Sequence, residues 1–237
     1  NHKEVVIKEA RPFTNPLNES VDAIYLLKNE FKKLKALEGL KITPDVHEQF
    51  TEWEHYYIVM DKVEGIELSR YITSNNPLLK PNISKKVLKN YNSNLNHLWY
   101  EIAESLLKLD YYGINVADIS SNNILVNDDK ITFIDFESAT YSHEKEIKLN
   151  TFGFRNYNNQ SVNERLSYLF LFTIYPINSI LENDKNKFFD FIGYLRNKNI
   201  ITSLSEKILN DLAMGELSLD DLLKILRHSD FNVLNLS

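Results

Sequence analysis

Apolar residues recur at helical spacing in two long stretches of the chain. From Val21 to Leu40 they follow three- and four-residue steps, which predicts an amphipathic helix. A second stripe predicts a helix that ends before Gly113. The two stripes consist of Ile24, Leu27, Phe31, Leu34 and Leu37, and of Leu98, Ile102, Leu106 and Leu109. The longest apolar run, from Leu166 to Ile177, predicts a buried helix, because it is too short to span a bilayer.

Short β-branched and aromatic runs predict strands, and the last two of them predict a hairpin. These runs are Val5 to Lys8, Tyr56 to Met60, Ile124 to Val126 and Ile131 to Ile134. A polar stretch from Ser138 to Glu164 follows, and the remainder is mostly helical. The segment Ser218-Leu-Asp-Asp221 resembles a helix capping box with aspartate in the glutamate position. No internal repeat or low-complexity linker interrupts this order, so no boundary to a second domain is predicted.

Composition narrows the classes of protein that this pattern fits. The 237 residues are enough for one large or two-lobed domain whose core needs no disulfides. Because cysteine is absent, disulfides and thiolate metal sites are excluded, and the cytoplasm is the expected location. The net charge of -6 argues against a nucleic-acid or membrane surface. From the sequence given, we expect no secretory segment before Val5, and the six histidines are too widely spaced to predict a zinc site.

Candidate chemistry is concentrated between Asp118 and Asp135. Asp118 and Asn123 are separated by four residues, and Asp135-Phe136 follows the next apolar strand. Phosphoryl transfer from Mg-ATP needs a carboxylate that meets the incoming hydroxyl, and an amide and a second carboxylate that hold magnesium. The flanking strands are expected to fix these polar groups on a rigid hairpin. The spacing therefore predicts Asp118 as the catalytic base and Asn123 and Asp135 as metal ligands.

Two charged residues nearer the N-terminus fit the same chemistry. Lys8 ends the first predicted strand, and Glu30 lies on the buried-face side of the following helix. A strand lysine that orients the α- and β-phosphates and is held by a helix carboxylate is the arrangement that kinases use. A lone lysine is most often exposed, and Glu19, which precedes the helical stripe, is an alternative partner. The chain order favours a pair between Lys8 and Glu30.

From Lys8 to about Pro176 the chain resembles the eukaryotic-type protein kinase fold. The resemblance implies an α+β, two-lobed structure, with a partial N-lobe in residues 1–63 and a mainly helical C-lobe in residues 64–237. ATP, or another nucleoside triphosphate, and Mg²⁺ are the implied cofactors.

The same resemblance implies where the nucleotide binds. The run Met60-Asp61-Lys62-Val63 is similar to the gatekeeper and hinge. The backbone carbonyl of Asp61 and the backbone N–H of Val63 are then expected to pair with adenine. Glu67 matches a position that often contacts the ribose.

A narrower resemblance is to the central kinase domain of class III and class IV lanthipeptide synthetases. It rests on Lys8-Glu-Ala-Arg-Pro12, Asp118-x-Ser120-x-Asn-Asn123, Ile134-Asp135-Phe136-Glu137-Ser-Ala139 and, late in the activation segment, Thr151-Phe-Gly-Phe154. Such synthetases phosphorylate Ser and Thr of a leader-bearing precursor peptide, eliminate the phosphate in a lyase domain and form thioether rings in a cyclase domain. The resemblance implies that this chain performs the first step alone. The precursor peptide and the lyase and cyclase domains are its implied partners.

Several positions depart from the common kinase pattern. Val116-Ala117 stands where most kinases have His-Arg, so a phosphate on the activation segment loses its usual ion-pair partner. We therefore expect this segment to fold without phosphorylation. Ser120 replaces a lysine that commonly steadies the γ-phosphate. Glu137 replaces a glycine that takes positive φ easily, so we expect the loop at Asp135 to be locked inward.

Further parts of the kinase pattern are missing from the sequence. No Gly-x-Gly-x-x-Gly loop precedes Lys8, so the N-lobe is expected to be truncated and the chain to bind ATP weakly. The segment from Arg155 to Gln160 stands where Ala-Pro-Glu is usual. The aspartate that usually opens the following buried helix is also absent, and Glu164 is the nearest carboxylate.

Three classes of function remain open. The first is an ATP-dependent Ser/Thr peptide kinase domain of a lanthionine-forming enzyme. The second is a pseudokinase that binds a peptide or a partner domain, which Val116-Ala117 and the missing loop favour. The third is a small-molecule phosphotransferase of the aminoglycoside or choline kinase type, in which Ile-Asp-Phe-Glu also occurs. The polar segment from Ser138 to Asn163 suits a peptide better than a compact alcohol, and the complete set of catalytic residues favours the first class.

Overall fold

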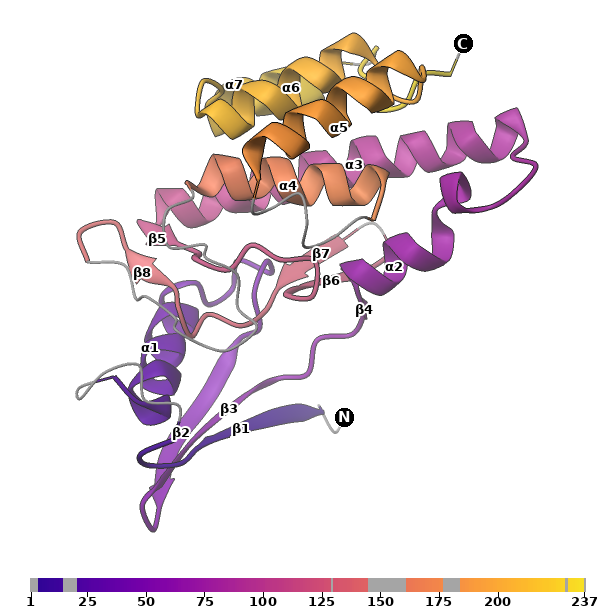
Figure 1. Cartoon of the computed structure of the whole chain (residues 1–237). Coiled ribbons are helices and arrows are strands. Elements are labelled where there is room, and N and C mark those ends of the chain that lie inside the picture. The colour runs from indigo at the N-terminus through magenta and orange to yellow at the C-terminus, as the bar shows by residue number, and fades with distance from the viewer. Residues whose placement is uncertain are drawn as a thin grey trace.

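The computed structural model describes residues 4–14, 21–128, 130–144, 161–176, 184–228 and 230–236. A strand-rich N-terminal end adjoins a larger, mainly helical end, and a small sheet lies between them (Figure 1). Among the described residues, no helix combines the length and the apolar character that a membrane crossing needs. Helices and strands therefore both contribute to the structure, as an α+β arrangement requires.

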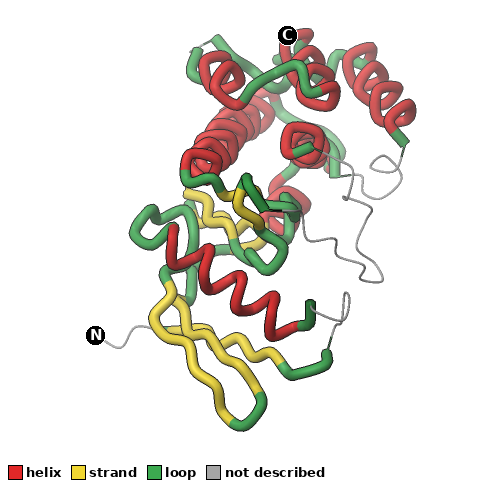
Figure 2. The backbone as a smooth tube through the Cα atoms, turned by 90° about the vertical axis from the view of Figure 1, so that its left-hand side faces the viewer, coloured by secondary structure: helices red, strands yellow, loops and turns green. Residues whose placement is uncertain are grey.

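A three-stranded antiparallel sheet forms the N-terminal end. Its strands are β1 (Val5–Ala10), β2 (Val46–Glu52) and β3 (His55–Asp61), in the order β1-β3-β2. The central strand β3 alternates buried and half-buried residues, because one of its faces packs on the core. Helix α1 (Ala23–Ala36) crosses this sheet (Figure 2). Asp22 caps α1 by accepting a hydrogen bond from the backbone N–H of Tyr25.

The elements predicted for this end are confirmed, apart from one strand. The predicted helix is α1, which ends at Ala36 rather than at Leu40, and the predicted stripe residues Leu27, Leu34 and Leu37 are buried. The runs that begin at Val5 and Tyr56 lie within β1 and β3. Strand β2 was not predicted, because every residue after Val46 is exposed and the strand lacks an apolar alternation.

A second, smaller set of strands joins the two ends. β4 (Ile66–Glu67), β6 (Ile124–Asn127) and β7 (Lys130–Phe133) form a sheet in the order β4-β6-β7, and β5 (Ile114–Asn115) pairs with β8 (Thr140–Tyr141). The antiparallel pair β6–β7 confirms the predicted hairpin. Its inner face buries Ile124, Val126, Ile131 and Phe133, so the hairpin is anchored in the core.

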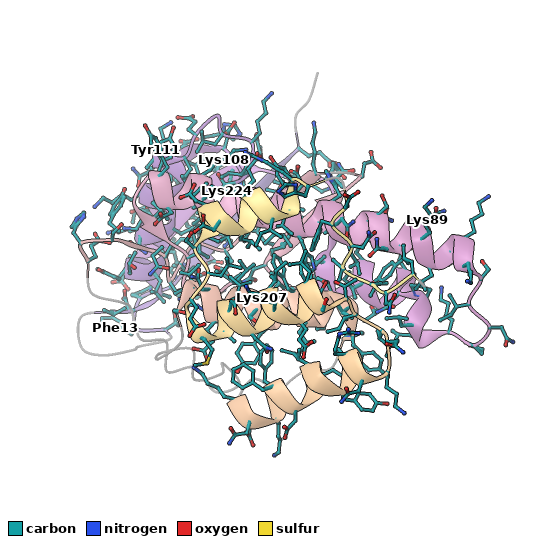
Figure 3. The ribbon with its side chains drawn as sticks, turned by 90° about the horizontal axis from the view of Figure 1, so that it is seen from above. Phe13, Lys89, Lys108, Tyr111, Lys207 and Lys224 are labelled. Atoms are coloured by element: carbon teal, nitrogen blue, oxygen red, sulfur yellow. The ribbon has the colours of Figure 1, made fainter. Side chains whose placement is uncertain are left out.

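The helical end consists of two layers. α3 (Lys85–Tyr111) and α4 (Val162–Ile174) lie next to the small sheet, with α2 (Leu68–Asn75) and the short helix η1 (Pro77–Leu79) at one end of α3. α5 (Lys185–Asn197), α6 (Ser203–Met214) and α7 (Leu219–Leu226) cover them, with Lys207 and Lys224 exposed on the outer face (Figure 3). Ser218 caps α7 by accepting from the backbone N–H of Asp221, as the capping pattern predicts.

Helix α4 is the buried centre of this end. Every residue from Glu164 to Ile174 is buried, which confirms the predicted buried helix up to Ile174. The indole ring of Trp99 on α3 stacks on Phe170 with ring centroids 4.2 Å apart, and its Nε1 donates a hydrogen bond of 2.9 Å to Thr173 Oγ1. These contacts fix α4 against α3.

Gly65 allows the segment after β3 to pass close to β6. Its φ is +148°, and a Cβ atom there would lie 2.9 Å from the carbonyl oxygen of Val126. We expect Gly65→Ala to lower the free energy of unfolding by about 2–3 kcal/mol, because backbone strain and a steric clash combine. Gly39→Ala is the control, since Gly39 has a φ of +82° but open space around its Cβ position. In denaturant unfolding, the control should lower the free energy of unfolding by about 1 kcal/mol. Equal losses of stability in the two variants would contradict the close approach of Gly65 to β6.

Candidate active site

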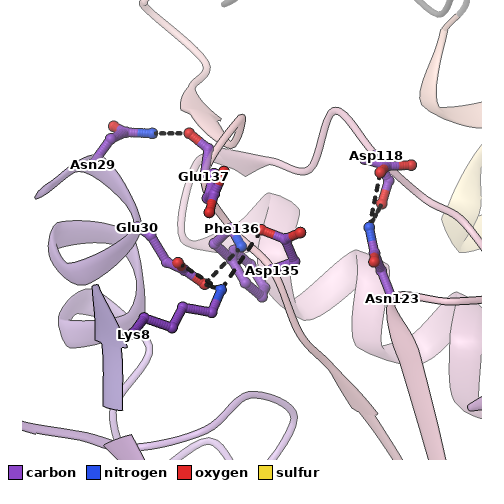
Figure 4. A network of polar contacts seen from close by, with 8 residues as sticks. All are labelled: Lys8, Asn29, Glu30, Asp118, Asn123, Asp135, Phe136 and Glu137. Atoms are coloured by element: carbon purple, nitrogen blue, oxygen red, sulfur yellow. Dashed lines mark hydrogen bonds and ion pairs between the residues drawn. The ribbon is translucent and has the colours of Figure 1, made fainter. Parts of the chain in front are cut away.

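Lys8 on β1 and Glu30 on α1 form an ion pair that confirms their predicted proximity (Figure 4). The Lys8 Nζ atom lies 2.7 and 2.8 Å from the two carboxylate oxygens of Glu30. Glu30 is 1% exposed, and its Oε1 also accepts a 3.2 Å hydrogen bond from the backbone N–H of Phe136. Asp135 Oδ1 lies 3.8 Å from the same ammonium. The strand, the helix and the Asp135 loop therefore meet at Lys8.

Opposing forces act on the pKa values of this pair. Burial raises the pKa of Glu30, and the ammonium of Lys8 opposes that rise. Burial lowers the pKa of Lys8, but the carboxylates of Glu30 and Asp135 outweigh it, so the pKa of Lys8 lies above its ordinary value. The two short hydrogen bonds favour the charged pair. These interactions favour the charged form of Lys8, whose ammonium can offset the negative charge of a bound group near β1.

Asp118 lies in the loop between β5 and β6 with one free carboxylate oxygen. It is 8% exposed, and its Oδ2 accepts a hydrogen bond of 2.9 Å from Asn123 Nδ2. Its Oδ1 is buried and has no hydrogen-bond partner. Burial raises the pKa of Asp118, and the charge of Asp135 adds to that rise, while hydrogen bonds from Asn123 and Ser120 oppose it. A buried acceptor of this kind suits a hydroxyl donor.

The two predicted metal ligands occupy adjacent positions of the β6–β7 hairpin. The backbone N–H of Ile134 donates a 2.9 Å hydrogen bond to the carbonyl oxygen of Asn123, which places Asn123 beside the residue before Asp135. The Asn123 amide nitrogen faces Asp118, so its amide oxygen remains for other contacts. Amide and carboxylate oxygens are the donors that magnesium prefers. The donor types present therefore fit a magnesium ion, and the assignment of Asn123 and Asp135 as its ligands stays a prediction.

The loop that carries Asp135 folds inward. Asp135 itself has a positive φ of 66°, and the side chain of Phe136 is fully buried. Single carboxylate oxygens of Glu30, Asp135 and Glu137 lie within 4.8 Å of one another. Burial, followed by the charges of Asp135 and Glu30, raises the pKa of Glu137 to about 7, and the charge of Lys8 opposes this. Lys8 thus pairs with one member of this carboxylate group, Glu30, and lies 3.8 Å from a second, Asp135.

The residues assigned to the nucleotide lie along one segment. Met60 is buried at the end of β3, and the next residue, Asp61, lies 2.5 Å from His47 Nε2 through its Oδ1. Val63 follows β3, and Glu67 precedes α2, with its Oε2 3.5 Å from Arg70 Nε. The segment runs from the N-terminal sheet to the small sheet. Its adenine and ribose contacts stay predictions.

Two residues of α1 that hold the segment after Asp135 were missed in the sequence. Asn29 Nδ2 donates hydrogen bonds to the carbonyl oxygens of Glu137 (3.0 Å) and Ala139 (2.7 Å). Lys33 is completely buried, with its Nζ 2.6 Å from Glu144 Oε2 and 3.4 Å from the centroid of the Tyr141 ring. Lys33 follows Glu30 by three residues, so helical spacing puts both on one face. This spacing was the signal in the sequence from which the burial of Lys33 could have been predicted.

Part of the sequence pattern lies outside the described residues. This holds for Thr151-Phe-Gly-Phe154, for the Arg155–Gln160 segment and for the alternative partner Glu19. Glu164, the carboxylate at the start of α4, is described and buried, and its Oε1 lies 3.2 Å from Lys185 Nζ on the next helix.

Comparison with known proteins relates the chain to a biosynthetic enzyme. It is 28% identical over 141 residues to a probable SapB synthase of Streptomyces coelicolor (strain ATCC BAA-471 / A3(2) / M145). The match covers 59% of this chain and 15% of that protein, so the chain spans a small part of this relative. No family model matches the chain. The chain is thus related in sequence to one part of a probable SapB synthase.

Proposed function

We propose that the chain is a kinase domain that transfers the γ-phosphate of ATP to Ser and Thr side chains of a precursor peptide, within a lanthipeptide synthetase. The observation that carries this proposal is the free, buried Oδ1 of Asp118 beside Asn123, in one site region with the Lys8–Glu30–Asp135 contacts. In this proposal, β1 to β3 and α1 are a partial kinase N-lobe, and the helical end is the C-lobe. The relation to a probable SapB synthase, a lanthipeptide synthetase, supports the choice of pathway.

In the proposed reaction, Asp118 acts on the hydroxyl of the acceptor, while Lys8, Asn123 and Asp135 act on the phosphates of ATP. Asp118 Oδ1 accepts the proton of the Ser or Thr hydroxyl and orients its oxygen toward the phosphate. Lys8 offsets the charge of the α- and β-phosphates, and Glu30 holds its ammonium in place. Asn123 and Asp135 would hold magnesium, which neutralises charge on the transferring phosphates when it is bound. Most of the rate enhancement then comes from positioning and electrostatics.

The partners follow from the same proposal. The acceptor is a leader-bearing peptide, and lyase and cyclase domains of the same synthetase process the phosphorylated product. Transfer to a small alcohol and binding without chemistry are the two competing functions. The complete set of Lys8, Asp118, Asn123 and Asp135 side chains favours chemistry over binding alone.

Phosphate transfer to a peptide, compared with transfer to free alcohols, tests the proposal. The chain is incubated with Mg-ATP at saturating concentration and a leader-bearing lanthipeptide precursor, and phosphorylated Ser and Thr are read by mass spectrometry. We expect phosphopeptide and no phosphorylated choline or aminoglycoside. Transfer to the alcohols alone would support the small-molecule phosphotransferase. Peptide binding without transfer would support the pseudokinase.

A further inference from the structure

Arg165 is a buried cation that reaches from α4 into the loop that carries Asp118. It is 3% exposed, and its Nη1 donates a hydrogen bond to the backbone carbonyl oxygen of Ala117, the residue directly before Asp118. All residues around it on α4, from Glu164 to Ile174, are buried. Burying a guanidinium is unfavourable unless hydrogen bonds and opposite charge compensate it. The contacts that compensate Arg165 include the Asp118 loop.

The loop around Ala117 is held by apolar contacts on both sides. Val116 is 4% exposed and Ile119 is 3% exposed, so both side chains pack into the core. These contacts fix the loop as a whole but do not fix the peptide plane between Ala117 and Asp118. The hydrogen bond from Arg165 fixes that plane, because it holds the Ala117 carbonyl oxygen. The direction in which the Asp118 side chain leaves the backbone then depends on Arg165.

The two charged residues in the first turn of α4 have different partners. Arg165 donates to the Ala117 carbonyl oxygen, directly before Asp118. The preceding residue, Glu164, faces Lys185 on α5, so the carboxylate at the start of α4 pairs away from the loop. The arginine therefore connects α4 to the loop.

Helix α4 is a rigid support for this contact. Ser161 caps its first turn by accepting from the backbone N–H of Glu164, and Ser167 Oγ donates to the Leu209 carbonyl oxygen on α6 at 2.6 Å. At its far end, the Tyr91 hydroxyl donates to the Thr173 carbonyl oxygen at 2.8 Å. The backbone that carries Arg165 is therefore fixed by its N-cap and by contacts with α6 and α3.

We propose that Arg165 is the positioning residue of the catalytic base: its hydrogen bond to the Ala117 carbonyl oxygen fixes the backbone directly before Asp118. The inference rests on the proposed kinase function for its kinetic part. The loop has Val116-Ala117 and no arginine of its own before Asp118, so α4 supplies the cation from a distant part of the sequence.

Arg165→Met tests the proposal, because methionine fills the space without a charge or a donor. With wild-type transfer to the precursor peptide established, we expect kcat to fall about 10- to 100-fold while the KM for ATP changes less than about twofold. Arg165→Lys, which restores a cation and a donor, should recover most of kcat. Hydrogen exchange of residues 114–123 should be faster in Arg165→Met than in the wild type.

Arg196→Met is the matched control. Arg196 lies on α5, on another helix than Arg165, and its Nε atom is 3.6 Å from Glu206 Oε2 on α6. It should leave kcat unchanged. If Arg165→Met does not fold, Arg165→Leu replaces it, since leucine also lacks a charge and a donor. A folded Met or Leu variant with wild-type kcat and exchange overturns the proposal, as does a loss that only follows the folded fraction. Absence of transfer by the wild type would reject the kinase function, while the exchange experiment still tests the anchoring.

Discussion

Asp118→Asn is expected to lower kcat for peptide phosphorylation about 10³-fold, with little change in ATP affinity or stability. The variant removes the carboxylate that accepts the hydroxyl proton but keeps its size. The amide oxygen can still accept the hydrogen bond that Asn123 Nδ2 now gives to Asp118 Oδ2. Because Oδ1 is buried without a partner, a neutral group there is not expected to destabilise the fold. Initial rates and calorimetric ATP binding measure the two effects.

The matched control for this variant is Asp128→Asn. Asp128 is an exposed residue at the turn of the β6–β7 hairpin with a φ of 51°, a conformation that asparagine adopts readily. It makes the same chemical change on the same hairpin but away from the free carboxylate oxygen, so kcat should stay within about twofold. If Asp118→Asn kept more than a tenth of the wild-type rate, Asp118 would not be the base.

The sequence was informative about Asp118, Asn123 and Asp135 because local structure positions them. Asn123 and Asp135 flank a short hairpin, and one backbone hydrogen bond from Ile134 to Asn123 brings its ends together. The pair between Lys8 and Glu30 could be predicted for a similar reason, since a strand and the helix that follows it pack on each other. Spacing along the chain was therefore sufficient for these contacts.

Contacts between segments that are distant in the sequence could not be predicted from residue spacing. The first half of α3 is rich in asparagine, and the predicted stripe begins only at Leu98, although Leu88, Tyr91 and Leu95 extend it at helical spacing. The side chain of Asn92 is buried there because it accepts from the Leu234 backbone N–H at 2.7 Å and donates to Asn232 Oδ1 at 2.7 Å. Arg165 likewise gains its role only through a loop 48 residues before it. A polar residue that is buried by a remote partner looks like a surface residue in the sequence.

The Lys8→Met variant is expected to lose both activity and stability. The double variant Lys8→Met/Glu30→Gln is expected to regain stability but not activity. Glu30 is 1% exposed and lies beside Asp135 and Glu137, so without Lys8 its buried carboxylate keeps the backbone N–H of Phe136 as a hydrogen-bond donor but loses its ammonium partner. Breaking a buried pair in this way lowers the free energy of unfolding by about 3 kcal/mol. In the double variant a neutral glutamine can accept from the same N–H, so stability should return to within about 1 kcal/mol of the wild type.

Activity should not follow stability, because the proposed role of Lys8 is to offset phosphate charge. Both variants should show kcat/KM at least about 100-fold below the wild type. The control is Lys35→Met on α1, where an exposed ion pair of 2.7 Å to Glu38 is broken. Its effect on unfolding should be below about 0.5 kcal/mol, with full activity. If turnover returned together with stability in the double variant, Lys8 would only balance buried charge, and the nucleotide-binding role assigned to β1 would have to be abandoned.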